Sequence, residues 1–209
     1  MEGAKPDAVR AIGVADNLGW FDATATNATG RALLLLSAAV LSGGSITTGT
    51  YVPRFAIDDP RITEHIEHAL DVLRCGHRHI HTDDDSRATE IAPAEHQSLL
   101  GRCLVSLGLP HGAKSEGDVT LPNALEVAPR SVQYKWVEVY LLNRGLKQTD
   151  KDSIVVKEER SHAYREELAM FFEQLGGGTV TVSEYAVTLS AETARNLGFG
   201  RDGPYRAST

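Results

Sequence analysis

One apolar segment constrains what this chain can fold into more than any other. Residues 33–45 read LLLLSAAVLSGGS, with two alanines, Ala38 and Ala39, near the middle and a glycine pair at the end. An apolar run bounded by glycine is typical of a buried helix or of two short buried strands, and the length of this run favours a helix that glycine ends. It is too short to cross a bilayer, which takes roughly 20 apolar residues.

A second segment repeats this pattern. Residues 137–145 read VEVYLLNRG, and the glycines Gly44 and Gly145 lie 101 positions apart in a chain of 209 residues. A repeat at about half the chain length indicates two copies of one supersecondary unit. The sequence therefore predicts a single pseudo-symmetric protein built from two related halves.

The composition is that of an ordinary globular protein, with 42% hydrophobic and 23% charged residues. A net charge of -7 gives no overall attraction to nucleic acid, although an acidic protein can carry a local basic face. Cys75 and Cys103 have no partners at metal-ligand spacing, so we expect two free thiols in a reducing compartment. Because no basic and apolar leader opens the chain, we expect an intracellular, cytoplasmic location and no membrane partner.

Hydrophobic periodicity, interrupted by glycine and proline, predicts the same order of elements in both halves. The predicted fold class is α/β (α+β), with two pseudo-symmetric αββαββα repeats. The predicted divisions are an N-terminal arm at residues 1–29 with a short helix near 8–15, a first repeat at 30–108, a polar connector at 109–129, a second repeat at 130–199 and a C-terminal tail at 200–209. Helices are expected at 30–42, 61–73, 94–107, 131–143, 162–175 and 191–197, and strands within 45–58 and at 77–81, 87–91, 153–156, 179–182 and 185–189.

This order of elements resembles the LAGLIDADG family of homing endonucleases, including the endonuclease domains carried by inteins. Residues 36–44 (LSAAVLSGG) are similar to the first signature helix of that family, and residues 137–145 to the second. The connector at 108–125 (GLPHGAKSEGDVTLPNAL) is similar to the stretch with a Lys-Ser pair that leads to the second helix. The resemblance covers residues 30–199 and implies a monomer that binds double-stranded DNA.

The resemblance also implies a geometry. The two signature helices would pack at a pseudo-twofold axis, where small residues let the backbones approach; Ala38 and Ser42 fit this requirement better than Val139 and Asn143 do. Two four-stranded antiparallel sheets would then form a saddle, whose outward side chains enter the major groove of DNA.

The nucleases of this family need a carboxylate at the end of each signature helix to hold divalent metal. The matching positions here are Gly43 and Arg144, and neither side chain binds a cation. We therefore expect DNA binding without cleavage and without a cofactor. The alternative is an active endonuclease with rerouted acids such as Asp150 or Asp152, and only this alternative requires a divalent metal.

Eight basic residues are candidates for DNA contact. Lys114 matches the basic residue of the Lys-Ser connector, and the others lie on or next to predicted strands. Any one of them also fits an ordinary solvated charge, but their concentration in the predicted sheets favours nucleic acid. The eight are Arg54, Arg78, Arg87, Lys114, Lys147, Lys151, Lys157 and Arg160.

Three alternating histidines, His77, His79 and His81, give a second functional hypothesis. A strand would place the three imidazoles on one face, with the acidic residues 83–85 just beyond. Imidazoles at this spacing can bind zinc or another transition metal. The alternative is a polar strand face that looks toward DNA. A metal site would place the chain in another class, that of a His-rich metal-binding or protein-interaction module.

Overall fold

The computed structural model describes residues 4–57, 59–82, 89–112, 119–147, 151–200 and 203, with the backbone alone for residues 4–8 and 147. The first half contains α1 (Ala4–Asn17), α2 (Ala28–Ser42), β1 (Ser45–Ile46), β2 (Pro53–Ala56), the 3-10 helix η1 (Pro60–Ile62), α3 (Thr63–Val72), β3 (His77–Ile80), β4 (Glu90–Pro93) and α4 (Gln97–Ser106). The second half contains α5 (Asn123–Glu126), α6 (Arg130–Arg144), β5 (Gly145–Lys147), β6 (Ile154–Lys157), α7 (His162–Gly176), β7 (Val180–Val182), β8 (Ala186–Leu189) and α8 (Ala191–Asn196).

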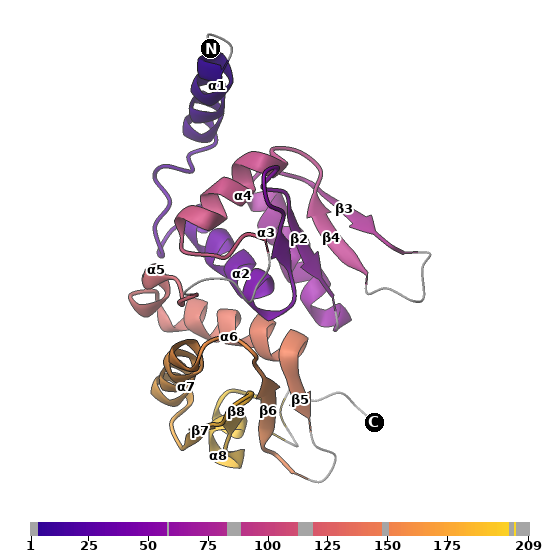
Figure 1. Ribbon diagram of the computed structural model, residues 1–209. Coiled ribbons are helices and arrows are strands. Elements are labelled where there is room, and N and C mark those ends of the chain that lie inside the picture. The colour runs from indigo at the N-terminus through magenta and orange to yellow at the C-terminus, as the bar shows by residue number, and fades with distance from the viewer. Residues whose placement is uncertain are drawn as a thin grey trace.

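The predicted αββαββα repeat is confirmed in both halves. Each half has one antiparallel four-stranded sheet, in the order β1-β2-β4-β3 in the first and β5-β6-β8-β7 in the second. The two orders are the same when the second half is counted from its own first strand. Figure 1 shows α2 and α6 at the middle of the molecule, with one half above them and the other below.

The helix α2 has clear start and stop signals. The side chain of Asn27 accepts a hydrogen bond from the Gly30 amide, which caps the helix N-terminus. The helix ends at the predicted glycine pair, where a Cβ on Gly44 would lie 2.5 Å from the carbonyl oxygen of Arg54. Glycine is therefore required at position 44, because the strand β2 returns directly against it.

The helices α2 and α6 pack against each other along their buried faces. Ala38 of α2 is fully buried. The indole Nε1 of Trp136 donates to Ser37 Oγ at 3.0 Å, and Asn143 Nδ2 donates to Ser42 Oγ at 3.1 Å. Asn143 thus fits the interface because its amide finds a hydroxyl on the other helix, although it is larger than the residue expected there.

Strand register separates the two faces of each sheet, because residues that pair across strands point to the same side. In the first sheet, Phe55, Ile91 and His79 are paired in one row, and the first two are buried in the core. Their neighbours along the strands point away from the core. We call this second side the open face, formed in the first sheet by Arg54, Ala56, Arg78, Ile80, Glu90 and Ala92 and in the second by Leu146, Val155, Lys157, Thr181 and Thr188. Ala92, which pairs with Arg78, is the buried member of this set.

The structure adds elements that the sequence did not indicate. The strand β5 follows α6 without a break, and the short helix α5 lies within the connector. The connector is also part of the core, since Val119 and Leu125 are buried. Both cysteines are free, as predicted, and burial raises the pKa of the Cys75 thiol to about 12. No helix among the described residues is long and apolar enough to cross a membrane.

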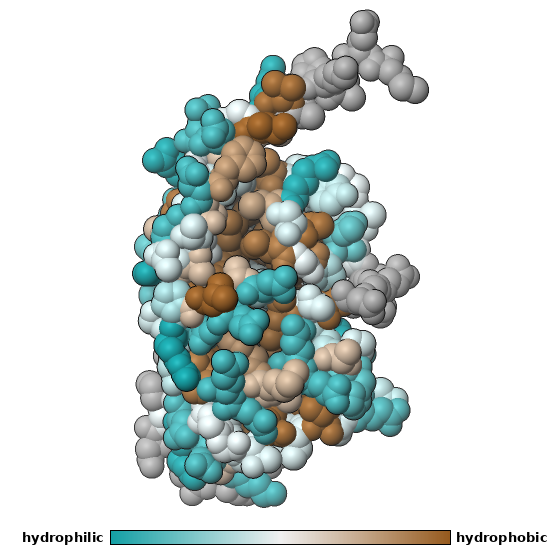
Figure 2. Space-filling view, turned by 90° about the vertical axis from the view of Figure 1, so that its left-hand side faces the viewer, coloured by the Kyte–Doolittle hydropathy of each residue, from teal (hydrophilic) through white to brown (hydrophobic). Residues whose placement is uncertain are grey.

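The N-terminal helix α1 projects from the body of the molecule (Figure 1). It is longer than the short helix predicted near residues 8–15. A groove of about 870 Å³ lies between α1, α2 and α4 and is lined by apolar side chains such as Trp20, Leu33 and Leu99. Figure 2 shows this apolar groove below α1, on the side of the molecule that is at the left in Figure 1.

A pair of serine variants tests the contact at the centre of the helix pair. Ser37 and Ser106 each donate to the carbonyl oxygen three residues earlier, but only Ser37 is buried and accepts the Trp136 N–H. Ser37→Ala leaves that buried donor without a partner, so we expect it to lower the free energy of unfolding by about 1–3 kcal/mol. The matched control Ser106→Ala should cost no more than about 0.5 kcal/mol. Urea unfolding of both variants measures the difference, and equal losses would contradict the role of this bond.

Candidate nucleic-acid interface and the ends of the paired helices

The two positions that correspond to the catalytic acids lie next to each other across the helix pair. Gly43 directly follows α2, and Arg144 is the last residue of α6. The residues just before them, Ser42 and Asn143, are joined by a hydrogen bond. Gly43 and Arg144 therefore occupy equivalent positions in the two halves. A Cβ on Gly43 would lie only 2.5 Å from Asn143 Nδ2. A carboxylate at position 43 would therefore require Asn143 to move.

Arg144 has protein partners on both halves. Its Nη1 donates to the Ser42 carbonyl oxygen at 3.1 Å, and its Nε donates to the Lys157 carbonyl oxygen at 2.8 Å. The Glu158 carboxylate lies 3.5 Å from the same Nε. The guanidinium thus satisfies a carbonyl that the end of α2 leaves free, where a positive charge is favourable. The ends of α2 and α6 therefore meet at the guanidinium of Arg144, where the nucleases of the LAGLIDADG family would need a pair of carboxylates.

Arg160 was predicted to contact DNA, but the structure buries it. Its side chain is 5% exposed and its Nη1 lies 2.8 Å from Oε2 of Glu158, which is fully buried. Its Nη2 donates to the Leu41 carbonyl oxygen at 2.7 Å, and the guanidinium lies over the Tyr164 ring, 4.9 Å from its centre. A buried arginine with these partners is not available to phosphate, so Arg160 is excluded from the interface.

Two buried tyrosines complete this cluster. The Tyr140 hydroxyl donates to Glu158 Oε2 at 2.9 Å. Burial, with the neighbouring Tyr164 and Glu158, raises the pKa of Tyr140 well above its usual value. Burial also raises the pKa of Tyr164 to about 12. Both hydroxyls therefore stay neutral near neutral pH. Glu158 accepts hydrogen bonds from Tyr140 and Arg160 and forms an ion pair with Arg144.

Three of the predicted basic residues lie on the open face. Arg54 is on β2 and Arg78 on β3, and Lys157 ends β6 in the second sheet. Arg78 and Lys157 are exposed, and Arg54 is half-buried beside Glu90 at 3.4 Å. Lys151 is exposed just before β6. The open faces of both sheets thus carry positive charge, and Glu90 adds one acceptor.

Several predicted residues fall outside this description. Arg87, Lys114 and Asp150 lie outside the described residues, as do residues 83–85, and for Lys147 only the backbone is described. Asp152, the other acid considered for a rerouted nuclease, has its Oδ2 atom 2.9 Å from Arg195 Nη1.

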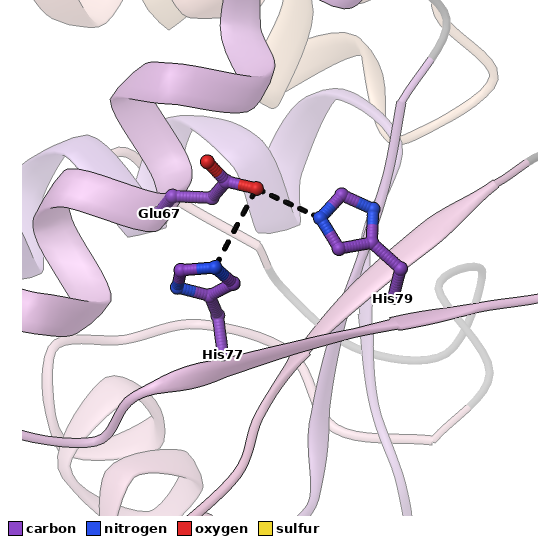
Figure 3. Close-up of side chains that lie close together, drawn as sticks. All are labelled: Glu67, His77 and His79. Atoms are coloured by element: carbon purple, nitrogen blue, oxygen red, sulfur yellow. Dashed lines mark hydrogen bonds and ion pairs between the residues drawn. The ribbon is translucent and has the colours of Figure 1, made fainter.

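The structure brings together two of the three predicted histidines and adds a carboxylate. His77 and His79 point toward α3 and not toward the open face, and both imidazoles approach Glu67 (Figure 3). His81 follows the end of β3 with a left-handed φ of 63° and lies 3.9 Å from Glu90. His81 therefore does not share the face on which His77 and His79 lie, so the predicted set of three imidazoles is wrong for His81. The alternative, a polar strand face that looks toward DNA, does not describe His77 and His79, because both contact Glu67 of α3.

Solved structures share this architecture. Full-length DUF199/WhiA from Thermatoga maritima matches with a TM-score of 0.54 and 7% identity over 84% of this chain and 57% of that one. The homing endonuclease I-WcaI bound to its DNA recognition sequence matches with a TM-score of 0.53 and 12% identity over 80% of each chain. This chain thus spans little more than half of the WhiA protein. No protein-family model and no curated protein sequence matches it.

These likenesses define the class of the fold. The mixed α/β architecture with two four-stranded antiparallel sheets is homing-endonuclease-like, as the order of elements in the sequence predicted. At 7% and 12% identity the comparisons establish the fold alone. Assignment to the LAGLIDADG family itself remains a prediction.

The buried ion pair at the helix ends can be tested with two matched variants. Glu158→Gln removes the carboxylate that faces Arg160, and a buried cation without its partner costs about 3–5 kcal/mol. We therefore expect a loss of unfolding free energy of that size. The control Glu166→Gln changes an exposed carboxylate that pairs with His162 on α7, where we expect about 0–1 kcal/mol. A small loss for Glu158→Gln in urea unfolding would contradict the structural role of this cluster.

Proposed function

We propose that this protein binds double-stranded DNA along the open faces of its two sheets and does not cleave it. The observation that carries the proposal is the position of Arg78 and Lys157. They are exposed on the open faces of equivalent sheets in the two halves, on the fold that I-WcaI uses with its DNA. Guanidinium and ammonium groups at such positions can neutralise phosphates or donate to base edges.

The shape of the two sheets suits the major groove. The groove admits paired β-strands, and alternation along a strand directs every second side chain outward. Because α2 and α6 pack against each other, we expect the two open faces to keep a fixed position relative to one another. A single chain would thus supply two half-site readers, so we propose that it acts as a monomer. This would make it a degenerate, cytoplasmic relative of LAGLIDADG and intein endonucleases.

The side chains at the helix ends support the proposal that this protein does not cleave DNA. Catalytic divalent cations in nucleic-acid enzymes need carboxylate oxygens next to the scissile phosphate. Gly43 offers no side-chain donor atom, and Arg144 places a positive charge at the matching position. The alternative is a rerouted nuclease that uses Asp150 or Asp152. Since Asp152 already pairs with Arg195, such a site would have to break that contact.

DNA binding predicts a salt dependence of definite size. Arg54, Arg78, Lys151 and Lys157 could release counterions from about four phosphates, so log affinity should fall with log salt with a slope of about -3 to -4. Arg78→Ala or Lys157→Ala should each weaken binding and make that slope shallower by about 1. Fluorescence anisotropy with a pool of random duplexes measures both, and light scattering of the complex should give one chain per duplex.

A control variant distinguishes binding at the open faces from a nonspecific effect of removing any exposed positive charge. Arg31→Ala removes an exposed arginine from the first turns of α2, at the helix end opposite Gly43, and should leave affinity and slope unchanged. Lack of binding at low salt, or an equal effect of Arg31→Ala and Arg78→Ala, would contradict the proposed surface.

The proposal also predicts that the protein does not cut DNA. Incubation with supercoiled plasmid libraries and Mg²⁺ or Mn²⁺ should leave the plasmids uncut, because positions 43 and 144 carry no carboxylate and the nearby Glu158 is paired with Arg144 and Arg160. Reproducible, metal-dependent double-strand breaks would contradict this proposal. Their loss in Asp152→Asn would then assign the activity to the rerouted nuclease.

A further inference from the structure

A second site lies on the opposite side of β3 from Arg78. Glu67 of α3 and His77 and His79 of β3 converge there, and their ligand atoms all lie within 4.8 Å of one another (Figure 3). We propose that this cluster binds a transition-metal ion of the zinc type, through one carboxylate oxygen and two imidazole nitrogens.

The local folding explains why these three residues meet. Residues two apart on a strand share a face, so His77 and His79 both project from β3 toward α3. Residues four apart on a helix also share a face, so Glu67 and Asp71 of α3 look back at that strand. The strand β3 is at the edge of its sheet, which leaves this side of the cluster open to solvent.

The distances fit a metal centre after a small adjustment. His77 Nε2 lies 3.6 Å and His79 Nε2 2.7 Å from the same oxygen, Oε1 of Glu67. Zinc with bonds of about 2.0–2.1 Å in a tetrahedral arrangement places its donor atoms about 3.3 Å apart. The first pair is close to that spacing, and the second must open by about half an ångström. The ligand nitrogens of the two imidazoles lie within 4.8 Å of each other, so metal binding would also have to bring these rings to the tetrahedral spacing. The three side chains are 26–37% exposed, so they have room for this rotation.

The orientation of the His77 ring is not explained by a simple surface contact between His79 and Glu67. A hydrogen bond between His79 and Glu67 would be complete without His77. Yet His77 turns its Nε2 to the same oxygen, while its Nδ1 lies 3.5 Å from Asp71 Oδ1. A carboxylate at the far nitrogen of a histidine is the usual outer partner of a metal ligand, because it fixes the tautomer that leaves Nε2 free to bind.

The donor set indicates the kind of ion and its effect. Two imidazoles and one carboxylate, with a fourth position open to water, suit zinc, cobalt or nickel better than magnesium or calcium, which prefer oxygen ligands. The ion would join α3 to the edge strand β3. It would therefore hold the strand that carries Arg78 on its other face, without being part of the DNA-binding surface itself.

Titration of the purified, chelator-treated protein with zinc chloride tests the site directly. Isothermal calorimetry should give one ion per chain. Glu67→Gln and His79→Ala should each weaken binding at least about tenfold, and Asp71→Asn about tenfold, as loss of an outer partner does. His81→Ala should leave the affinity unchanged, because His81 lies beside Glu90 and outside the cluster. Circular dichroism of each metal-free variant confirms that the fold is retained.

A second measurement uses the unchanged protein. In a two-dimensional NMR spectrum of the histidine rings, zinc should shift the signals of His77 and His79 and leave those of His81 and His111 in place. No saturable binding at millimolar zinc, an equal loss in His81→Ala, or shifts at the other histidines would each overturn the proposal. DNA binding measured in the presence of chelator is a separate readout, so failure of one proposal does not decide the other.

Discussion

The contact between α2 and α6 determines where everything else in the molecule lies. Both sheets begin at the ends of these helices, with β1 starting at Ser45 and β5 at Gly145, directly after α6. Two buried hydrogen bonds, from Trp136 to Ser37 and from Asn143 to Ser42, fix the relative position of the two helices. Because buried donors require partners, these bonds specify one alignment of the two helices. The position of one open face relative to the other follows from this alignment of the helices.

The helix ends show how this chain differs from a metal-dependent nuclease on the same kind of fold. Arg144 and Arg160 donate to the carbonyl oxygens of Ser42 and Leu41, which α2 leaves free at its end, and Glu158 balances part of their charge. Hydrogen bonds from these two arginines join the second half to the end of α2, and the ion pairs with Glu158 lie within the second half. This centre stabilises the arrangement of the sheets and offers no carboxylate to a cation at the matching positions. The proposed function, DNA binding without cleavage, agrees with both features.

The sequence contained the repeat but not the contacts between its copies. Glycine-terminated apolar segments and strand periodicity predicted both αββαββα units, since these signals are local. Burial of Arg160 was not predictable, because its neighbours Lys157 and Glu159 are exposed and its partner Leu41 is 119 residues away. The alternating histidines predicted a shared face for His77 and His79. They could not predict that Glu67 of α3 joins these two histidines. They also could not predict the left-handed backbone at His81, which lies outside the cluster.

The central claim is that the open faces of both sheets meet DNA together, and hydroxyl-radical footprinting of the protein tests it most directly. Oxidation of each side chain would be measured by mass spectrometry with and without duplex DNA. The account predicts that oxidation falls at Ile80 in the first sheet and at Leu146 in the second, and that it is unchanged at the exposed Phe21 and Met170 on the helical side. Protection of Phe21 or Met170, or of neither sheet, would contradict it.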